Sequence, residues 1–329
     1  MTASPSASLS DGPGLLVLGA LHVDEVATMR SEMVAGASNP VSWRRLVGGV
    51  ASNAARAAQA HFSYAGKGSV TLHAAVGNDM PGDALQKCLL EAGLHFTPHV
   101  VKESVTGRYS AIMSNTGELI LGLANVQLAE QLPPLFAQSA MQNNSVDALL
   151  LDANLSDGCI AALIKCAEET SIPVAAMTVS PSKAVRFLPM ASGIELLFCN
   201  RLEAQALAQA AGLISSKVLA ARLPLQTLGD ALAEIGFRQF VLTDGASDLL
   251  IGDNAEYTML AINPVKPGNS PGNTTGNVNG AGDALAGASL AAYCLGCTLI
   301  KAVMENGLGK AASVICGKHS PLPLDREGA

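Results

Sequence analysis

Charged residues are scarce in this sequence. Asp, Glu, Lys and Arg make up 14% of its 329 residues, against about 25% in an average soluble protein. Basic residues are also outnumbered, 20 to 27, which gives a net charge of −7. So few cations provide no broad electrostatic surface for a nucleic-acid polymer or an anionic membrane, although a small local anion site stays open. Apolar residues account for 49%, which excludes a mainly disordered protein.

Patterns typical of metal and disulfide sites are missing. The six histidines have no ligand spacing such as HxxxH, and the seven cysteines form an odd, scattered set. Cys294 and Cys297 make one CxxC pair, with no second pair elsewhere in the sequence. A structural zinc site usually needs four ligands. We therefore expect reduced thiols, mainly in the core.

The sequence has little that suggests a membrane span or a secretory signal. The uncharged apolar run at 284–300 has 17 residues, mostly Ala and other small types, whereas a spanning helix takes about 20 strongly apolar residues. The short run LLVLGAL at 15–21 has no Lys or Arg before it, unlike a signal peptide. We expect a cytoplasmic protein that buries 284–300 as a core helix.

Strand-like and helix-like segments alternate along most of the chain. Short apolar runs, typical of strands buried on both faces, lie at 15–20, 70–76, 147–152, 174–177, 195–199 and 240–243. Segments with helical spacing lie at 50–62, 80–92, 156–170, 201–212 and 217–236. This alternation indicates βαβ units, so we expect an α/β fold with a doubly wound, mainly parallel sheet and helices on both faces.

The length allows one large α/β domain or about two smaller ones. No internal repeat is evident, and we expect one domain over 15–320. Residues 1–14 are rich in Ser, Pro and Gly and are predicted to be a disordered tail, and 321–329 a C-terminal tail. Segments 23–47 and 106–124 break the alternation, and the second contains the hairpin signal NTGE. They predict a small β-lid over a ligand site; a sheet extension or a dimer surface is the alternative.

The strongest chemical motif is NVNGAGDALAGA at 277–288. Gly280, Ala281 and Gly282 would place backbone N–H groups at a helix start, where free donors and the helix dipole hold an anion. Asp283 would then lie beside a bound phosphoryl group as the base that transfer to an alcohol requires. A plain helix cap is the alternative for this carboxylate. A dinucleotide fingerprint fits poorly, because the motif follows a long loop rather than a first strand.

A second motif, LVGGVASNAARAA, occupies 46–58. Gly48 and Gly49 permit close approach of the backbone to a ligand, and Asn53 offers a donor and an acceptor to a hydroxyl. A helix start packed tightly on a sheet would have the same pattern.

Two further motifs follow expected strands. In LLFCNRLEAQAL, Asn200 and Glu203 stand three residues apart, a spacing that also fits a capping box. In VLTDGASDLLI, a strand runs into a glycine turn at Thr243 to Gly245. Neither motif specifies a function alone.

Together and in this order, the four motifs resemble the ribokinase-like, or PfkB, family of carbohydrate kinases over about 15–320. The resemblance implies an ATP-dependent phosphotransferase with an alcohol acceptor, with ATP and Mg²⁺ as cofactors. The expected acceptor is the 5′-hydroxyl of a ribosyl substrate, with pseudouridine favoured. Another sugar or nucleoside, such as ribose or fructose, is the alternative, as is a catalytically silent binding protein that regulates a partner.

The resemblance also implies a role for each matching residue. The base would be Asp283, with the phosphoryl group held by Gly280, Ala281 and Gly282. Substrate would be bound by Asp24, Gly48, Gly49, Asn53 and Asn154. We expect the base of the substrate to lie under the lid near Asn115 and Asn125, because an Asn amide matches both a donor and an acceptor of a uracil ring. The nucleotide would be bound by Lys183, Asn200, Glu203, Thr243 and Gly245. Of these, Glu203 would also position Mg²⁺, through water.

The sequence departs from the family pattern in several places. His22 stands where Asn is common before the substrate Asp, and Met177 and Thr178 replace an Asp-Pro type pair; these changes leave the substrate's identity open. Asn277 lacks the charge that would favour K⁺, which weakens the case for the monovalent-cation site that many relatives carry and leaves K⁺ an open alternative. An exposed lid edge would allow a homodimer.

Overall fold

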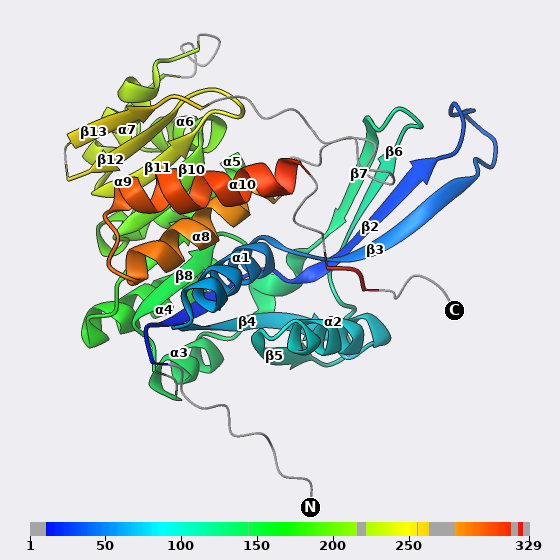
Figure 1. Cartoon of the computed structure of the whole chain (residues 1–329), viewed down its shortest axis with the longest axis horizontal. Helices are drawn as coiled ribbons and strands as arrows, with labels where there is room; N and C mark the ends of the chain where they lie inside the picture. Colours follow the sequence, from blue (N-terminus) through cyan, green and yellow to red (C-terminus); the bar gives the residue numbers. More distant parts are fainter. Residues whose placement is uncertain are drawn as a thin grey trace, which may run out of the picture.

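Runs of Leu, Val and Ala form a central nine-stranded sheet in a computed structural model of the chain (Figure 1). The structure describes residues 11–143, 145–215, 222–254, 256–262, 280–316 and 322–324. The strand order is β13-β12-β11-β10-β9-β8-β1-β4-β5. The strands are β1 (Gly14–Leu18), β4 (Ser69–Gly77), β5 (His95–Val101), β8 (Ala148–Asp152), β9 (Val174–Met177), β10 (Leu196–Asn200), β11 (Gln239–Thr243), β12 (Leu249–Asp253) and β13 (Glu256–Leu260).

The sheet is parallel from β5 to β11, and only β12 and β13 run antiparallel at one edge. Every residue of β1, β8 and β9 is buried, as expected for strands covered on both faces. The predicted α/β class with a mainly parallel sheet is confirmed. Strand β1 lies between β8 and β4, where the strand order changes direction. In folds of this class the ligand crevice lies at the carboxyl ends of the strands at this point.

Helices cover both faces of the sheet, and each set has its own apolar core. One face carries α1 (Val50–Ala65), α2 (Met80–Glu91), α8 (Ala281–Cys294), α9 (Leu299–Lys301), the π-helical turn η4 (Ala302–Gly307) and α10 (Leu308–Ile315). The other carries α3 (Pro134–Asn143), α4 (Asp157–Thr170), α5 (Pro181–Ala184), the 3₁₀ helix η2 (Val185–Gly193), α6 (Arg201–Ala210) and α7 (Leu225–Ile235). The 3₁₀ helix η1 (Gln127–Gln131) precedes α3.

Helix α8 is apolar on all sides, and every residue from Ala284 to Ala292 is buried. A Cβ atom on Gly287 would lie 2.1 Å from the Ala54 carbonyl oxygen, so glycine allows α8 to pack directly against α1. This close packing brings the N-termini of the two helices together. Within the described ranges, no helix is both long enough and apolar enough to cross a membrane.

A second sheet of four strands projects from the body (Figure 1). Its order is β3-β2-β6-β7, formed by β2 (His22–Met29), β3 (Val41–Gly48), β6 (Arg108–Met113) and β7 (Leu119–Asn125). The two irregular segments of the sequence thus form one β-appendage, with the predicted hairpin turn closed by the Gly117 N–H and the Ser114 carbonyl at 3.0 Å. All residues of β7 are exposed. The predicted tails and Asn277 lie largely or wholly outside the described residues.

Candidate active site

The paired N-termini of α1 and α8 bring Asn53 and Asp283 into contact. The Asn53 Nδ2 donates a hydrogen bond to Asp283 Oδ2 at 2.9 Å. The Asn53 Oδ1 accepts one from the Arg56 guanidinium at 2.5 Å. Because both ends of the amide are engaged, its N–H group is held toward the carboxylate. Two motifs 230 residues apart therefore meet at one point.

Asp283 is in the first turn of α8, but it does not cap the helix. Gly280 is the N-cap residue, with φ +84 and no side-chain capping bond. The first amides of a helix have no partner within it, so the N–H groups that follow Gly280 are available to an anion. The structure thus differs from the simple capping interpretation: the carboxylate reaches across to α1 instead.

The surroundings of Asp283 favour its neutral form. Burial raises the pKa of this carboxyl to about 7 from an ordinary 3.8, and the negative charges of Asp152, Asp24 and Glu203 raise it further, whereas the bond from Asn53 opposes the shift. A carboxyl with a pKa near neutrality accepts and releases a proton readily at physiological pH. This property is expected of a general base.

Asp24 lies against the backbone at the end of β3. A Cβ atom on Gly48 would be 2.3 Å from the Asp24 carboxyl group, so only glycine leaves room for it. Gly49, with φ +105, lies so close to the Ala20 carbonyl that a Cβ atom would approach to 2.2 Å. His22 Nε2 lies 3.0 Å from Asp24 Oδ1. The glycine pair therefore places Asp24 near the start of α1, beside Asn53 and Asp283.

Asn200 and Glu203 form the capping box that their spacing allows. Asn200 Oδ1 accepts from the Glu203 N–H at 3.1 Å, and Glu203 Oε2 accepts from the Asn200 N–H at 2.8 Å. The Thr178 hydroxyl also donates to Glu203 Oε2 at 2.5 Å. Thr178, a departure from the family pattern, thus orients the buried Glu203. Roles toward the nucleotide and Mg²⁺ stay predictions for both residues.

Thr243 and Gly245 lie at the neighbouring strand end. Thr243 is paired in register with Asn200, and Gly245 has φ +63 in the following exposed turn. Between them, Asp244 accepts hydrogen bonds from Arg201 at 2.8 Å and Arg222 at 2.5 Å. These bonds lower the pKa of Asp244. The turn is thereby fixed beside the start of α6.

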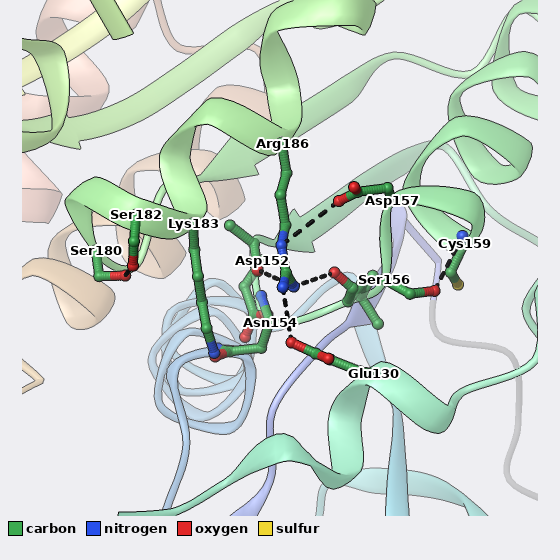
Figure 2. A network of polar contacts seen from close by, with 12 residues as sticks. Glu130, Asp152, Asn154, Ser156, Asp157, Cys159, Ser180, Ser182, Lys183 and Arg186 are labelled. Carbon is green, nitrogen blue, oxygen red and sulfur yellow. Dashed lines mark hydrogen bonds and ion pairs between the residues drawn. The ribbon is translucent and has the colours of Figure 1, made fainter. Parts of the chain in front are cut away.

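Lys183 extends from α5 toward the loop after β8 (Figure 2). Its Nζ donates to Asn154 Oδ1 at 2.7 Å. Val179, two residues before α5, has φ +68, which is rare for a β-branched residue and indicates local strain. A predicted nucleotide residue and a predicted substrate residue are therefore in direct contact.

Asn115 and Asn125 lie at opposite ends of the β6–β7 hairpin. Asn125 pairs in register with Arg108 at the base, and Asn115 is exposed in the turn after Met113. Six residues of β-strand separate the two ends by about 20 Å. The structure does not bring the two residues together, because a hairpin moves its turn away from the strand ends; their contacts with a substrate base stay predictions. Of the two, Asn125 alone shares the base of the β-appendage with Asp24.

Two residues near the cluster were missed in the sequence. Arg56 lies between carboxylates: burial lowers its pKa, while Asp24 and Asp283 raise it. Asp152 is buried at the end of β8 and also raises the pKa of Asp283. The sequence did contain a signal for Asp152, because a carboxylate ends the otherwise apolar run ALLLD. Nothing comparable distinguishes Arg56 from a surface arginine on α1.

A Mg²⁺ ion that enters with a nucleotide needs few protein ligands. In the part of the chain that the structure describes, no group of three or more His, Cys, Asp or Glu side chains could hold a metal ion. Magnesium usually keeps several waters and binds one or two protein carboxylates together with substrate phosphates. Glu203 is the carboxylate that the sequence predicts for this role, and one of its oxygens is already engaged in the capping box.

Comparisons with known proteins agree with the observed fold. A model of the pfkB family of carbohydrate kinases matches residues 16–321. A carbohydrate kinase from Agrobacterium tumefaciens is 29% identical, with a TM-score of 0.73 over 95% of this chain and 93% of that structure. Adenosine kinase from Anopheles gambiae, solved with a di(adenosine) tetraphosphate, is 18% identical, with a TM-score of 0.73 over 93% of this chain and 96% of its own; it supports the fold alone.

Among curated proteins, the pseudouridine kinase of Arabidopsis thaliana is 30% identical over 200 residues. That stretch is 59% of this chain and 50% of the relative, so the match spans half the length of that protein.

Proposed function

The chain belongs to the pfkB family of carbohydrate kinases, and we propose that it transfers the γ-phosphoryl group of ATP to the 5′-hydroxyl of a ribosyl substrate. One observation carries this proposal: Asp283, with a pKa of about 7, stands in the first turn of an uncapped helix. A proton acceptor and a set of free backbone donors are thus provided at one helix end. Transfer of a phosphoryl group to an alcohol needs both.

In the proposed reaction, Asp283 takes the proton of the substrate hydroxyl as its oxygen attacks the γ-phosphorus. The bond from this phosphorus to the β–γ bridging oxygen breaks, and ADP leaves. The N–H groups that follow Gly280 stabilise the charge on the transferring group. Asn53 keeps the carboxylate aimed at the hydroxyl, and Asp24 binds the ribose hydroxyls. When Mg²⁺ is bound, it neutralises phosphate charge.

We propose that the nucleotide lies along the carboxyl ends of β9 to β11. Lys183 would contact its phosphates, and Asn200 and Glu203 would position Mg²⁺ through water. The turn at Thr243 and Gly245 would contact the rest of the nucleotide. This arrangement is supported by the strand order, because the strands that precede these residues, β9, β10 and β11, are neighbours in the sheet.

Pseudouridine is the substrate that we favour. The 30% identity to a pseudouridine kinase supports it, as do segments such as CNRLEAQAL, SNTGELIL and LDANLSDGCIAAL, which resemble that enzyme. Pseudouridine has one more ring N–H than uridine, because its sugar is attached through carbon. A site that pairs this N–H rejects uridine, since an unpaired buried polar group costs about 1–3 kcal/mol. Asn125, at the base of the lid, is our candidate partner.

The test compares kcat/KM for pseudouridine, uridine, ribose and fructose. We expect pseudouridine to be preferred, and Asn125→Ala to reduce its advantage over uridine. Asn115→Ala is the matched control, because it removes the same side chain from the far end of the same hairpin. A tenfold preference for ribose or fructose would refute pseudouridine and leave a sugar kinase. Substrate binding without ATP consumption would instead indicate a silent binding protein.

A further inference from the structure

Asp152 is a fully buried carboxylate without an evident task in the proposed chemistry. Its exposed fraction is 0%, and buried carboxylates are usually paired with a cation. Within the described residues, hydrogen bonds alone compensate its burial. Burying a carboxylate is costly. Because hydrogen-bond donors rather than a cation surround Asp152, we ask which segments these donors come from.

Three backbone amides from three separate segments converge on Asp152. Oδ2 accepts from the Ala20 N–H at 2.9 Å and from the Ala51 N–H at 3.0 Å. Oδ1 accepts from the Asn154 N–H at 2.8 Å. One side chain therefore joins the turn after β1, the first turn of α1 and the loop after β8. These segments meet where the strand order of the sheet changes direction.

Each segment also carries a side chain that we assign to substrate. Asp24 follows Ala20 by four residues, and Asn53 follows Ala51 by two. Asn154 itself donates one of the three backbone N–H groups. We propose that Asp152 is a positioning residue that fixes the three substrate-binding segments relative to one another. The proposal rests on the proposed function for the roles of those side chains, but the hydrogen bonds that define it do not.

The surrounding backbone is shaped to fit this carboxylate. A Cβ atom on Gly19 would lie 2.3 Å from the Asp152 carboxyl carbon and from Oδ2. Any other residue at Gly19 would displace the carboxylate from the amides of Ala20 and Ala51. Position 19 must therefore be glycine for the Asp152 carboxylate to keep its hydrogen bonds.

The loop after β8 is held from its other side as well (Figure 2). The Arg186 guanidinium donates to the carbonyl oxygens of Ala153 at 3.1 Å and Leu155 at 2.8 Å, and to Glu130 at 2.7 Å. Lys183 donates to the Asn154 side chain. Asp152 is thus the link between this braced loop and the two segments on the substrate side.

Asp152 also acts on Asp283 through its charge. Its negative charge raises the pKa of Asp283, as do those of Asp24 and Glu203; among the described residues, the cation Arg56 interacts with the same carboxyl. Burial raises the pKa of Asp152 itself, and the three backbone amides and the Asn154 side chain oppose that shift. The hydrogen bonds to its two oxygens favour the ionised form, against the effect of burial. Removing this charge should make Asp283 more acidic.

The experiment compares Asp152→Asn with Asp147→Asn. Asp147 immediately precedes β8 and accepts the Gly14 N–H at 2.7 Å, so the control makes the same change at the other end of the strand, about 16 Å away. In Asp152→Asn we expect the KM for the ribosyl substrate to rise at least about fivefold and the KM for ATP to stay within about twofold. The acid limb of the pH profile should move down by about half a pH unit or more.

Gly19→Ala provides a second variant, because it displaces the carboxylate and keeps its charge. We expect it to raise the substrate KM and to leave the acid limb in place. Kinetics and an acid limb for Asp152→Asn that match Asp147→Asn would overturn the proposal. The proposal would also be overturned if the KM for the ribosyl substrate and the KM for ATP rose equally and in proportion to a loss of thermal stability. That result would indicate a purely structural role.

Hydrogen exchange separates this proposal from the proposed function. The Ala20 and Ala51 amides should exchange faster in Asp152→Asn than in wild type or Asp147→Asn, whatever the enzyme's activity. A wild-type protein that phosphorylates no ribosyl or sugar compound would refute the proposed function only. Unchanged exchange at both amides would refute the positioning role, even in an active kinase.

Discussion

Replacing Asp283 with Asn should nearly abolish activity and yet stabilise the folded protein above neutral pH. The substitution keeps the size of the side chain and removes its charge. Loss of a general base lowers kcat by about 10²–10⁴-fold, so we expect a fall of at least about 10²-fold, with little change in ATP binding. The wild-type rate should increase with pH through about 7, because the carboxylate form takes the proton.

The gain in stability follows from the raised pKa. The folded protein holds the Asp283 proton more tightly than the unfolded chain, so the wild type loses stability as pH rises from about 3.8 through about 7. The full difference between these values corresponds to about 4 kcal/mol at 1.36 kcal/mol per unit. Because Asp283 is only partly shielded from water, we expect the wild type to lose about 1–3 kcal/mol of unfolding free energy over this pH range. The Asn variant lacks this loss.

Thermal unfolding at pH 5 and pH 8 measures the effect. The stability difference between Asp283→Asn and wild type should be small at pH 5 and should favour the variant at pH 8. Asp83→Asn is the control: this exposed carboxylate is in the first turn of α2, where a negative charge is favourable, so its loss should slightly destabilise. An Asp283→Asn enzyme that keeps a tenth of the rate, or is equally destabilised at both pH values, would refute the reasoning.

The remaining predictions concern the anion site, the lid and the ribose end. Gly280→Ala should lower kcat about tenfold, because φ +84 strains any other residue and a Cβ atom would lie 3.3 Å from the Asn53 amide; Gly212→Ala, with φ +77 in open space, is the kinetic control. Residues 106–124 should gain protection from hydrogen exchange on adding pseudouridine, because closure excludes water; unchanged exchange would indicate a static surface. Asp24→Ala should raise KM for pseudouridine, uridine and ribose by similar factors, and selective loss of one substrate would contradict a ribose contact.

Much of the sheet could be predicted from sequence, because strands such as β8 and β9 are uninterrupted apolar runs. Strand β5, with the sequence HFTPHVV, was missed: it is at the sheet edge, and its exposed or partly buried positions include two histidines and a proline. Strands β12 and β13 were not predicted as an antiparallel extension, since the local pattern does not specify pairing direction.

The site was predictable where one local motif carried it. The GAGD sequence predicts both a helix start and a base. The structure places Asp283 in the first turn of that helix, and its role as a base stays a prediction. Asp152 was missed because its partners, Ala20 and Ala51, are more than 100 residues away in sequence. The separation of Asn115 from Asn125 depends on hairpin length rather than on the turn signal. Such long-range geometry is determined by packing, which no short motif contains.

Phosphorus NMR of the reaction products tests the central claim most directly. With ATP, Mg²⁺ and pseudouridine, the wild-type enzyme should yield ADP and one new phosphomonoester in equal amounts. The new signal should be a triplet, because a phosphate on the 5′-oxygen couples to two protons. A doublet would place the phosphate on a secondary hydroxyl. Inorganic phosphate alone, or unchanged ATP with every sugar and nucleoside tried, would contradict the proposed kinase.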